Sequence, residues 1–196
     1  KQAVKTPAFW FFFLYMVLLT GSTAFASIIP TMAIESGYDT VISGFAMTAF
    51  MAGTAVAALA FGTIADKLGP LKANIAACCC GAIAVLGLIF FRSNLYLFFG
   101  SLFFYGCLAS TLGVLGPLVI GTLFGQKEFG SIYGLVLMAT GVGSMILIPA
   151  YGFIYDVVGS FQPALFMIMG FILVCGFAIT MAFRTGKKVQ QSWMPK

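Results

Sequence analysis

Six long apolar runs dominate the sequence, and each is long enough to cross a lipid bilayer. A spanning helix needs about 20 mainly apolar residues, and only helices or closed barrels satisfy every backbone polar group inside a membrane. None of the runs alternates as a barrel strand does. The sequence therefore predicts an all-α membrane protein with six transmembrane helices. We expect these helices at residues 8–29, 41–65, 73–91, 95–124, 130–154 and 163–183.

The fourth run is longer than a straight span requires. It is either tilted in the bilayer or bent near residues 113–117, where Pro117 removes a backbone donor beside Gly113 and Gly116. We expect one of these two arrangements.

The composition excludes most soluble functions. Charged residues make up 8% of the chain, whereas a soluble domain carries roughly 25%. The net charge of +5 comes from scattered loop and tail residues, so it predicts attraction to the lipid surface of the cytoplasmic leaflet and no nucleic-acid partner. The chain lacks His, and its five cysteines lie inside apolar runs without metal-binding spacing. We expect no metal, no cofactor and no enzyme activity.

The basic residues predict the orientation. With both termini in the cytoplasm, nine basic residues lie inside and only Arg92 lies outside, as the positive-inside rule requires. The inner set is Lys1, Lys5, Lys67, Lys72, Lys127, Arg184, Lys187, Lys188 and Lys196. We therefore expect a multi-pass protein of the cytoplasmic membrane, with its acidic outer residues at Glu35, Asp39 and Asp156.

The sequence also repeats itself at a distance of 90 residues. The second and fifth runs both end in Gly-x-x-x-Asp-x-x-Gly, so that Asp66 aligns with Asp156 and Gly69 with Gly159. Gly44, Gly53 and Gly62 align with Gly134, Gly143 and Gly152. The repeat units are residues 8–91 and 95–183, and an odd number of spans gives them opposite orientations in the membrane. Inverted repeats of this kind are the structural basis of alternating access.

The loop after the second run carries a recognisable signature. Residues 62–72 read Gly-Thr-Ile-Ala-Asp-Lys-Leu-Gly-Pro-Leu-Lys, which resembles the cytoplasmic signature of the major facilitator superfamily, except that Leu71 stands where a basic residue is usual. Residues 124–134 and 152–160 resemble the loops between helices 10 and 11 and between helices 11 and 12 of its carboxyl-terminal half. The chain is most similar to oxalate/formate-type and monocarboxylate-type carriers.

This resemblance implies helices 7 to 12 of a twelve-helix carrier. Residues 1–7 would be the end of the central cytoplasmic loop, residues 8–183 the bundle and residues 184–196 a cytoplasmic tail. The chain begins with Lys1 rather than Met, as expected of a segment from a longer protein. The implied partners are a small-molecule substrate, the lipid bilayer and the amino-terminal six-helix half of the same carrier.

The implied activity is secondary transport of a small organic solute, with an organic anion such as a carboxylate as the first expectation. Two observations count against an anionic substrate. Ala58 stands where such carriers often have Arg, and no charged residue lies in the middle of any run. An uncharged or drug-like solute is the alternative. A six-helix channel is less favoured, because the Asn-Pro-Ala motifs of water channels are absent. A membrane enzyme lacks a catalytic constellation, and a scaffolding or accessory role is a further alternative.

The signature predicts a cytoplasmic gate built from Gly62, Asp66, Lys67, Gly69 and Lys72. Asp66 ends its helix, where the helix dipole disfavours an anion, so it needs a donor elsewhere. The resemblance implies that this donor is the amino end of the fifth run, near Gly130.

Polar groups at mid-membrane depth are the candidates for the substrate pathway, because hydroxyls beside glycine-rich or broken helices can bind a solute without a charge. The alternative is that each hydroxyl bonds only its own backbone. The candidates are Tyr15, Thr20, Ser22, Tyr105, Ser110, Thr111, Thr140 and Ser144.

Overall fold

The structure is a computed structural model that describes residues 6–125 and 129–193, with side chains described through residue 186. The predicted inner residues Lys1, Lys5, Lys127, Lys187, Lys188 and Lys196 therefore lie outside the described side chains. Six helical spans of membrane length are present in the described chain. This confirms the predicted all-α fold with six spans.

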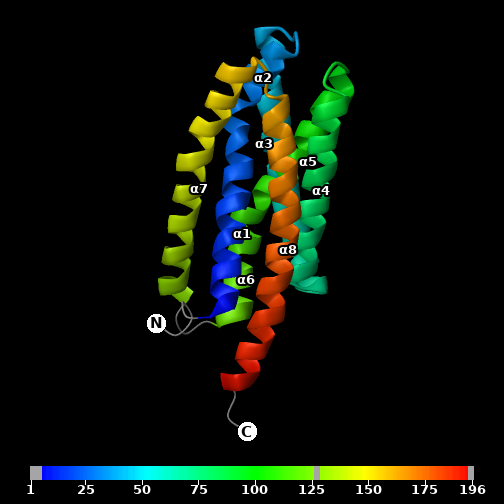
Figure 1. The fold of residues 1–196 in the computed structure, drawn as a ribbon. Coiled ribbons are helices and arrows are strands. Elements are labelled where there is room, and N and C mark those ends of the chain that lie inside the picture. The colour runs from blue at the N-terminus through cyan, green and yellow to red at the C-terminus, as the bar shows by residue number, and fades with distance from the viewer. Residues whose placement is uncertain (1–5, 126–128, 194–196) are drawn as a thin grey trace.

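The helices run between two ends of an elongated bundle (Figure 1). One end carries α2 and the loops α4–α5 and α7–α8, and we call it the Glu35 end. The other carries the α3–α4 turn and is called the Asp66 end; α1 starts and α8 finishes there. The elements are α1 (Pro7–Ala24), the 3₁₀ segment η2 (Phe25–Ile28), α2 (Ile29–Glu35), α3 (Thr40–Leu68), α4 (Pro70–Phe90), α5 (Leu95–Gly113), α6 (Leu115–Phe124), α7 (Phe129–Val158) and α8 (Gln162–Trp193).

The first span is broken, which the sequence analysis did not predict. In a regular α-helix the Phe25 N–H would bond to the Gly21 carbonyl, but here it bonds to the carbonyls of Ser22 and Thr23. The chain then runs as a 3₁₀ helix until α2 begins, with Pro30 in its first turn. Pro30 has no N–H to offer the turn before it. The break therefore leaves the Gly21 carbonyl without its usual helical donor.

The fourth span bends where expected. It divides at Val114 into α5 and α6, inside the predicted range 113–117. Pro117 lies in the first turn of α6, where a missing N–H costs little. Of the two arrangements expected for this span, a tilt or a bend, the bend is therefore confirmed. The sixth span continues as helix to Trp193, past the start of the tail expected at residue 184.

Equivalent glycines end α3 and α7. Gly69 has a φ of 88° and Gly159 a φ of 71°, a region that favours glycine. The Gly69 N–H donates to the Ala65 carbonyl at 2.9 Å, and the Gly159 N–H donates to the Tyr155 carbonyl at 2.7 Å. Ala65 and Tyr155 are themselves 90 residues apart, so the two helix ends have the same geometry. This is what the repeat predicts for its shared motif.

The two units exchange packing partners. The first helix of the first unit, α1, packs mainly against α7 and α8 of the second unit. The first helix of the second unit, α5, packs mainly against α3 and α4 of the first. The two third helices, α4 and α8, pack against each other. Under the 90-residue offset the contacts of α1 correspond to those of α5, and the α4–α8 contact corresponds to itself, as expected for an inverted repeat.

Two glycines that are equivalent in the repeat lie at close helix contacts. A Cβ added to Gly53 of α3 would lie 2.0 Å from the Phe103 carbonyl oxygen of α5. A Cβ added to Gly143 of α7 would lie 2.5 Å from the Val17 carbonyl oxygen of α1. Glycines that admit backbone-to-backbone contact stabilise helix pairs in lipid, where no hydrophobic force joins them. Gly53 and Gly143 are 90 residues apart, so equivalent glycines allow the close approach of α3 to α5 and of α7 to α1.

Candidate functional site

Two tyrosines bind the break in the first span. The Tyr151 hydroxyl of α7 donates to the Gly21 carbonyl at 2.9 Å, and the Tyr105 hydroxyl of α5 donates to the Ser22 carbonyl. Both side chains are fully buried. Neighbouring side chains commonly re-satisfy carbonyls that a broken membrane helix frees. We call Gly21, Ser22, Tyr105 and Tyr151 the break cluster.

Tyr15 is the repeat equivalent of Tyr105, but it bonds to α4, whereas Tyr105 bonds to α1. Its hydroxyl donates to Asn74 Oδ1 of α4 at 2.6 Å, and Asn74 Nδ2 donates to the Pro70 carbonyl at 2.8 Å. Tyr15 and Asn74 are each only 1% exposed. Tyr15 and Tyr105 therefore join helices inside the bundle, and this structure shows neither of them at an open surface.

Most of the remaining candidate hydroxyls donate to their own helix. Each accepting carbonyl lies three or four residues earlier in the chain, which is the usual alternative for Ser and Thr in a span. Ser22, Ser110 and Thr111 are buried, whereas Thr140 and Ser144 are partly exposed on α7. The accepting carbonyls belong to Leu18, Cys107, Leu108, Leu137 and Thr140, respectively.

Thr20 is the exception. Its Oγ1 is buried and has no hydrogen-bond partner among the described residues. A buried hydroxyl without a partner loses free energy relative to one in water. Thr20 lies directly before Gly21 and thus beside the break cluster. Of the eight pathway candidates, Thr20 alone has a hydroxyl without a hydrogen-bond partner among the described residues.

The predicted gate residues lie together at the turn between α3 and α4. Asp66, Lys67 and Lys72 are exposed, and within the described chain none of them has a hydrogen-bond or ion-pair partner. The implied contact between Asp66 and Gly130 is not formed. The reason is the exchanged packing: α3 packs against α5, whereas α7, which begins just before Gly130, packs against α1 on the other side of the bundle (Figure 1).

The sequence analysis missed two residues that organise the interior, Tyr151 and Asn74. Tyr151 stands beside Pro149 in a glycine-rich helix, and Asn74 is the one Asn within an apolar run. A polar side chain that is buried in a span almost always has a partner. From this rule, the position of both residues inside apolar runs would have predicted that each has a hydrogen-bond partner in the interior.

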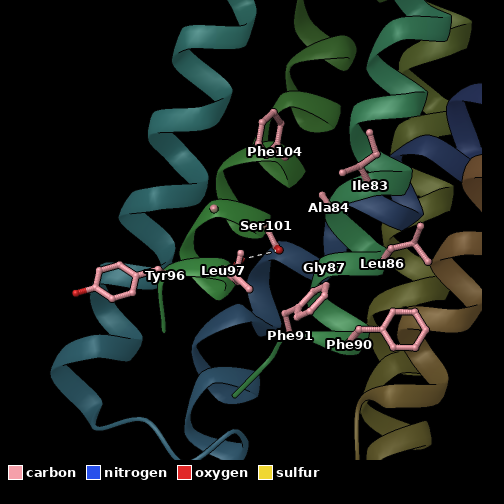
Figure 2. A pocket seen from close by; sticks show the side chains of 11 residues that line it. Ile83, Ala84, Leu86, Gly87, Phe90, Phe91, Tyr96, Leu97, Ser101 and Phe104 are labelled. Carbon is pink, nitrogen blue, oxygen red and sulfur yellow. Dashed lines mark hydrogen bonds between the residues drawn. The ribbon is translucent and has the colours of Figure 1, made fainter. Parts of the chain in front are cut away.

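A groove of about 380 Å³ lies between α4 and α5 near the Glu35 end. Figure 2 shows that its labelled side chains are carbon apart from the oxygens of Ser101 and Tyr96. The Ser101 hydroxyl donates to the Leu97 carbonyl at 2.7 Å. The groove therefore offers apolar surface and little polar chemistry for a hydrophilic solute. It is lined by Ile83, Ala84, Leu86, Gly87, Phe90, Phe91, Tyr96, Leu97, Gly100, Ser101 and Phe104.

Within the part of the chain that the structure describes, no group of three or more His, Cys, Asp or Glu side chains could hold a metal ion. The buried polar groups of the described spans are hydroxyls, thiols, one carboxamide and the backbone carbonyls at the break. Hydroxyls, carboxamides and backbone carbonyls bind their partners by hydrogen bonds.

Six apolar spans, a broken first span and a buried polar cluster at the break define a polytopic helical protein of the transporter class. The family model of the Major Facilitator Superfamily matches residues 11–193, and the chain belongs to this family. It is therefore a membrane transporter that binds a substrate, and its family is not one of enzymes. A search of the curated proteins gave no match.

Proposed function

We propose that this chain is the carboxyl-terminal six-helix bundle of a secondary active transporter that carries a small organic solute across the cytoplasmic membrane by alternating access. The exchanged packing of the two repeat units carries this proposal. Two inverted units around one centre provide two related arrangements, open to opposite sides. The amino-terminal bundle would supply the second wall of the pathway. The faces of α3 and α7 support this, since these two spans bury the smallest share of their length.

We propose an organic anion, such as a carboxylate, as the substrate. This rests on the resemblance of the loops to those of oxalate/formate-type and monocarboxylate-type carriers. The described bundle supplies hydroxyls at mid-span and no charge, so the countercharge for an anion has to come from the amino-terminal bundle. An uncharged or drug-like solute is the second candidate, and the uncharged interior is the observation that favours it.

In the proposed orientation the Asp66 end faces the cytoplasm and the Glu35 end faces outside. The basic residues support this orientation, because Lys67, Lys72 and Arg184 all belong to the Asp66 end and Arg92 to the Glu35 end. We further propose that Asp66 belongs to a cytoplasmic gate whose donor lies in the amino-terminal bundle. The exposed carboxylate of Asp66, which has no partner among the described residues, is available for such a contact.

Uptake by the full-length protein in sealed vesicles tests the proposal. A carrier gives saturable uptake and accelerated exchange when the same solute is present on the opposite side. A channel gives neither, and a scaffold gives no uptake above empty vesicles. Candidate solutes are a short monocarboxylate, a dicarboxylate and an uncharged compound of similar size. Uptake of all three in simple proportion to concentration would refute alternating access.

Thr20→Val tests the substrate pathway, since Val replaces the hydroxyl at nearly constant volume. If Thr20 binds the solute, KM rises by roughly tenfold, the effect of losing one hydrogen bond of about 1.4 kcal/mol. Ser110→Ala is the matched control, because Ser110 is the repeat equivalent and its hydroxyl donates to its own helix at 2.8 Å. Equal KM values for Thr20→Val and the parent would remove Thr20 from the pathway.

A further inference from the structure

One carboxylate at the Glu35 end joins three separate segments. Glu35 is the last residue of α2, and its Oε1 lies 3.3 Å from Arg92 Nη1 in the α4–α5 loop. The same Oε1 accepts a hydrogen bond from Ser160 Oγ at 2.9 Å. Its Oε2 accepts one from the Phe161 N–H at 3.3 Å. Ser160 and Phe161 belong to the α7–α8 loop. We call these four residues the Glu35 network.

The network is shielded from water. The Glu35 side chain is 13% exposed and that of Arg92 is 24% exposed. Hydrogen bonds to an ionised group are roughly twice as strong as neutral ones, and partial burial reduces the screening that makes surface ion pairs weak. Three charge-assisted contacts on one carboxylate therefore hold the tip of α2 more firmly than a surface ion pair would.

The Arg92 side of the network is fixed without Glu35. The Tyr38 hydroxyl donates to the Arg92 carbonyl at 2.8 Å, and the Tyr38 ring packs on Phe98 with centroids 5.1 Å apart. Burial raises the pKa of Tyr38, so its hydroxyl keeps its proton and remains a donor at neutral pH. The backbone of Arg92 is thus held by a bond that does not involve the Glu35 side chain.

The segment that Glu35 anchors is a short helix. α2 is seven residues long and is separated from α1 by the 3₁₀ segment. Near its start, Ser43 Oγ of α3 donates to the Pro30 carbonyl at 2.7 Å. Its buried face contributes Ile29, Met32 and Ala33 to the core. A helix this short is not stable by itself, so α2 depends on its buried face, on Ser43 at one end, and on Glu35 and Tyr38 at the other, where the Tyr38 N–H donates to the Ala33 carbonyl at 3.1 Å.

We propose that Glu35 is a positioning residue of the transport cycle: by binding both the α4–α5 and the α7–α8 loops, it keeps α2 docked, so that α2 moves with this bundle as the pathway opens and closes. The part of this proposal that concerns transport rests on the proposed function. The docking of α2 does not.

The docking is measured with a cysteine at a buried position of α2. Ala33 is 0% exposed, so a charged maleimide modifies Ala33→Cys only when α2 leaves the bundle. Exposed Thr31 on the same helix provides the control, since Thr31→Cys reacts without any movement. The full-length carrier is labelled in detergent, so that orientation does not affect the rate. Labelling of the parent protein corrects for its own cysteines.

Glu35→Gln keeps the size of the side chain but removes its charge. We expect it to raise the labelling rate of the Ala33→Cys protein by roughly tenfold, the population change for about 1.4 kcal/mol from one charge-assisted hydrogen bond. Arg92→Gln removes only the ion pair, so it gives a similar or smaller rise. The double variant exceeds Glu35→Gln by less than about twofold, because Glu35→Gln has already removed that ion pair. Asp39→Asn is the matched control. It removes a neighbouring carboxylate that only caps α3 and leaves the rate unchanged.

The outcomes separate the two parts of the proposal. If Glu35→Gln changes the labelling rate of Ala33→Cys by less than about twofold, the network is overturned as the anchor of α2. Faster labelling with unchanged saturable uptake leaves the docking intact and overturns its role in transport. Faster labelling together with slower uptake, at an unchanged rate for Thr31→Cys, supports both. A parent protein without saturable uptake refutes the proposed function while the labelling result still decides the docking.

Discussion

Gly53 provides the sharpest test of how the two units fit together. Alanine at this position places a Cβ 2.0 Å from the Phe103 carbonyl oxygen, whereas real Cβ contacts stay above 3.0 Å. The two helices would therefore have to separate by about 1 Å, the difference between these distances. The atom in the way belongs to the backbone and cannot rotate aside, so the whole of α3 or α5 has to move.

The expected magnitude follows from two opposing terms. Overpacking a well-packed interior costs about 1–3 kcal/mol, and a backbone contact belongs at the upper end. Replacing Gly by Ala inside a helix contributes about 1 kcal/mol of stability. We therefore expect Gly53→Ala to lower the free energy of unfolding by about 2 kcal/mol, close to a thirtyfold change in the equilibrium constant.

The assay is reversible unfolding of the purified carrier in mixed micelles with increasing SDS, followed by far-ultraviolet circular dichroism. Gly170→Ala on α8 is the control, because its Cβ would have no neighbour within 4 Å. It should unfold at the same SDS fraction as the parent or a higher one. The reasoning is refuted if Gly53→Ala is as stable as Gly170→Ala, since α3 and α5 would then not meet at this glycine.

Three further predictions use the same structure. Gly143→Ala, whose Cβ would lie 2.5 Å from the Val17 carbonyl, should destabilise by about 1 kcal/mol in the same unfolding assay, less than Gly53→Ala because the shift is smaller. Tyr151→Phe leaves the Gly21 carbonyl without its donor and should cost about 0.6–1.7 kcal/mol, the range for hydrogen bonds between membrane helices; an unchanged unfolding midpoint would argue against the bond. Asp66→Asn should lower transport and increase the inward-facing population, measured by cysteine accessibility from the cytoplasmic side, and unchanged values of both would remove the gate.

The sequence predicted the spans well because the physics of insertion is local. Backbone groups in lipid must pair within their own helix, so each span shows as an uninterrupted apolar run. The bend in the fourth span was also visible, since Pro117 follows two glycines. The break at Phe25–Ile28 was not, because the segment itself contains no proline. Pro30 was the one signal present, and its effect falls on the turn before it.

The site was harder to predict than the fold. The position of a Ser or Thr in the middle of a run makes its hydroxyl a candidate for the pathway. It does not show which way the side chain points or whether the hydroxyl already donates to a carbonyl of its own helix. Ser110 and Thr20 occupy equivalent positions in the repeat, yet one hydroxyl has a partner and the other has none among the described residues. Asp66 was placed beside Gly130 by analogy. The exchanged packing, which no local pattern encodes, keeps their helices apart.

The exchange of partners has a consequence for how such a chain is made. Since α1 finds its main neighbours in α7 and α8, a nascent chain holding the first three helices has no completed interior. We therefore expect the bundle to close late in synthesis, after the last helix has entered the membrane.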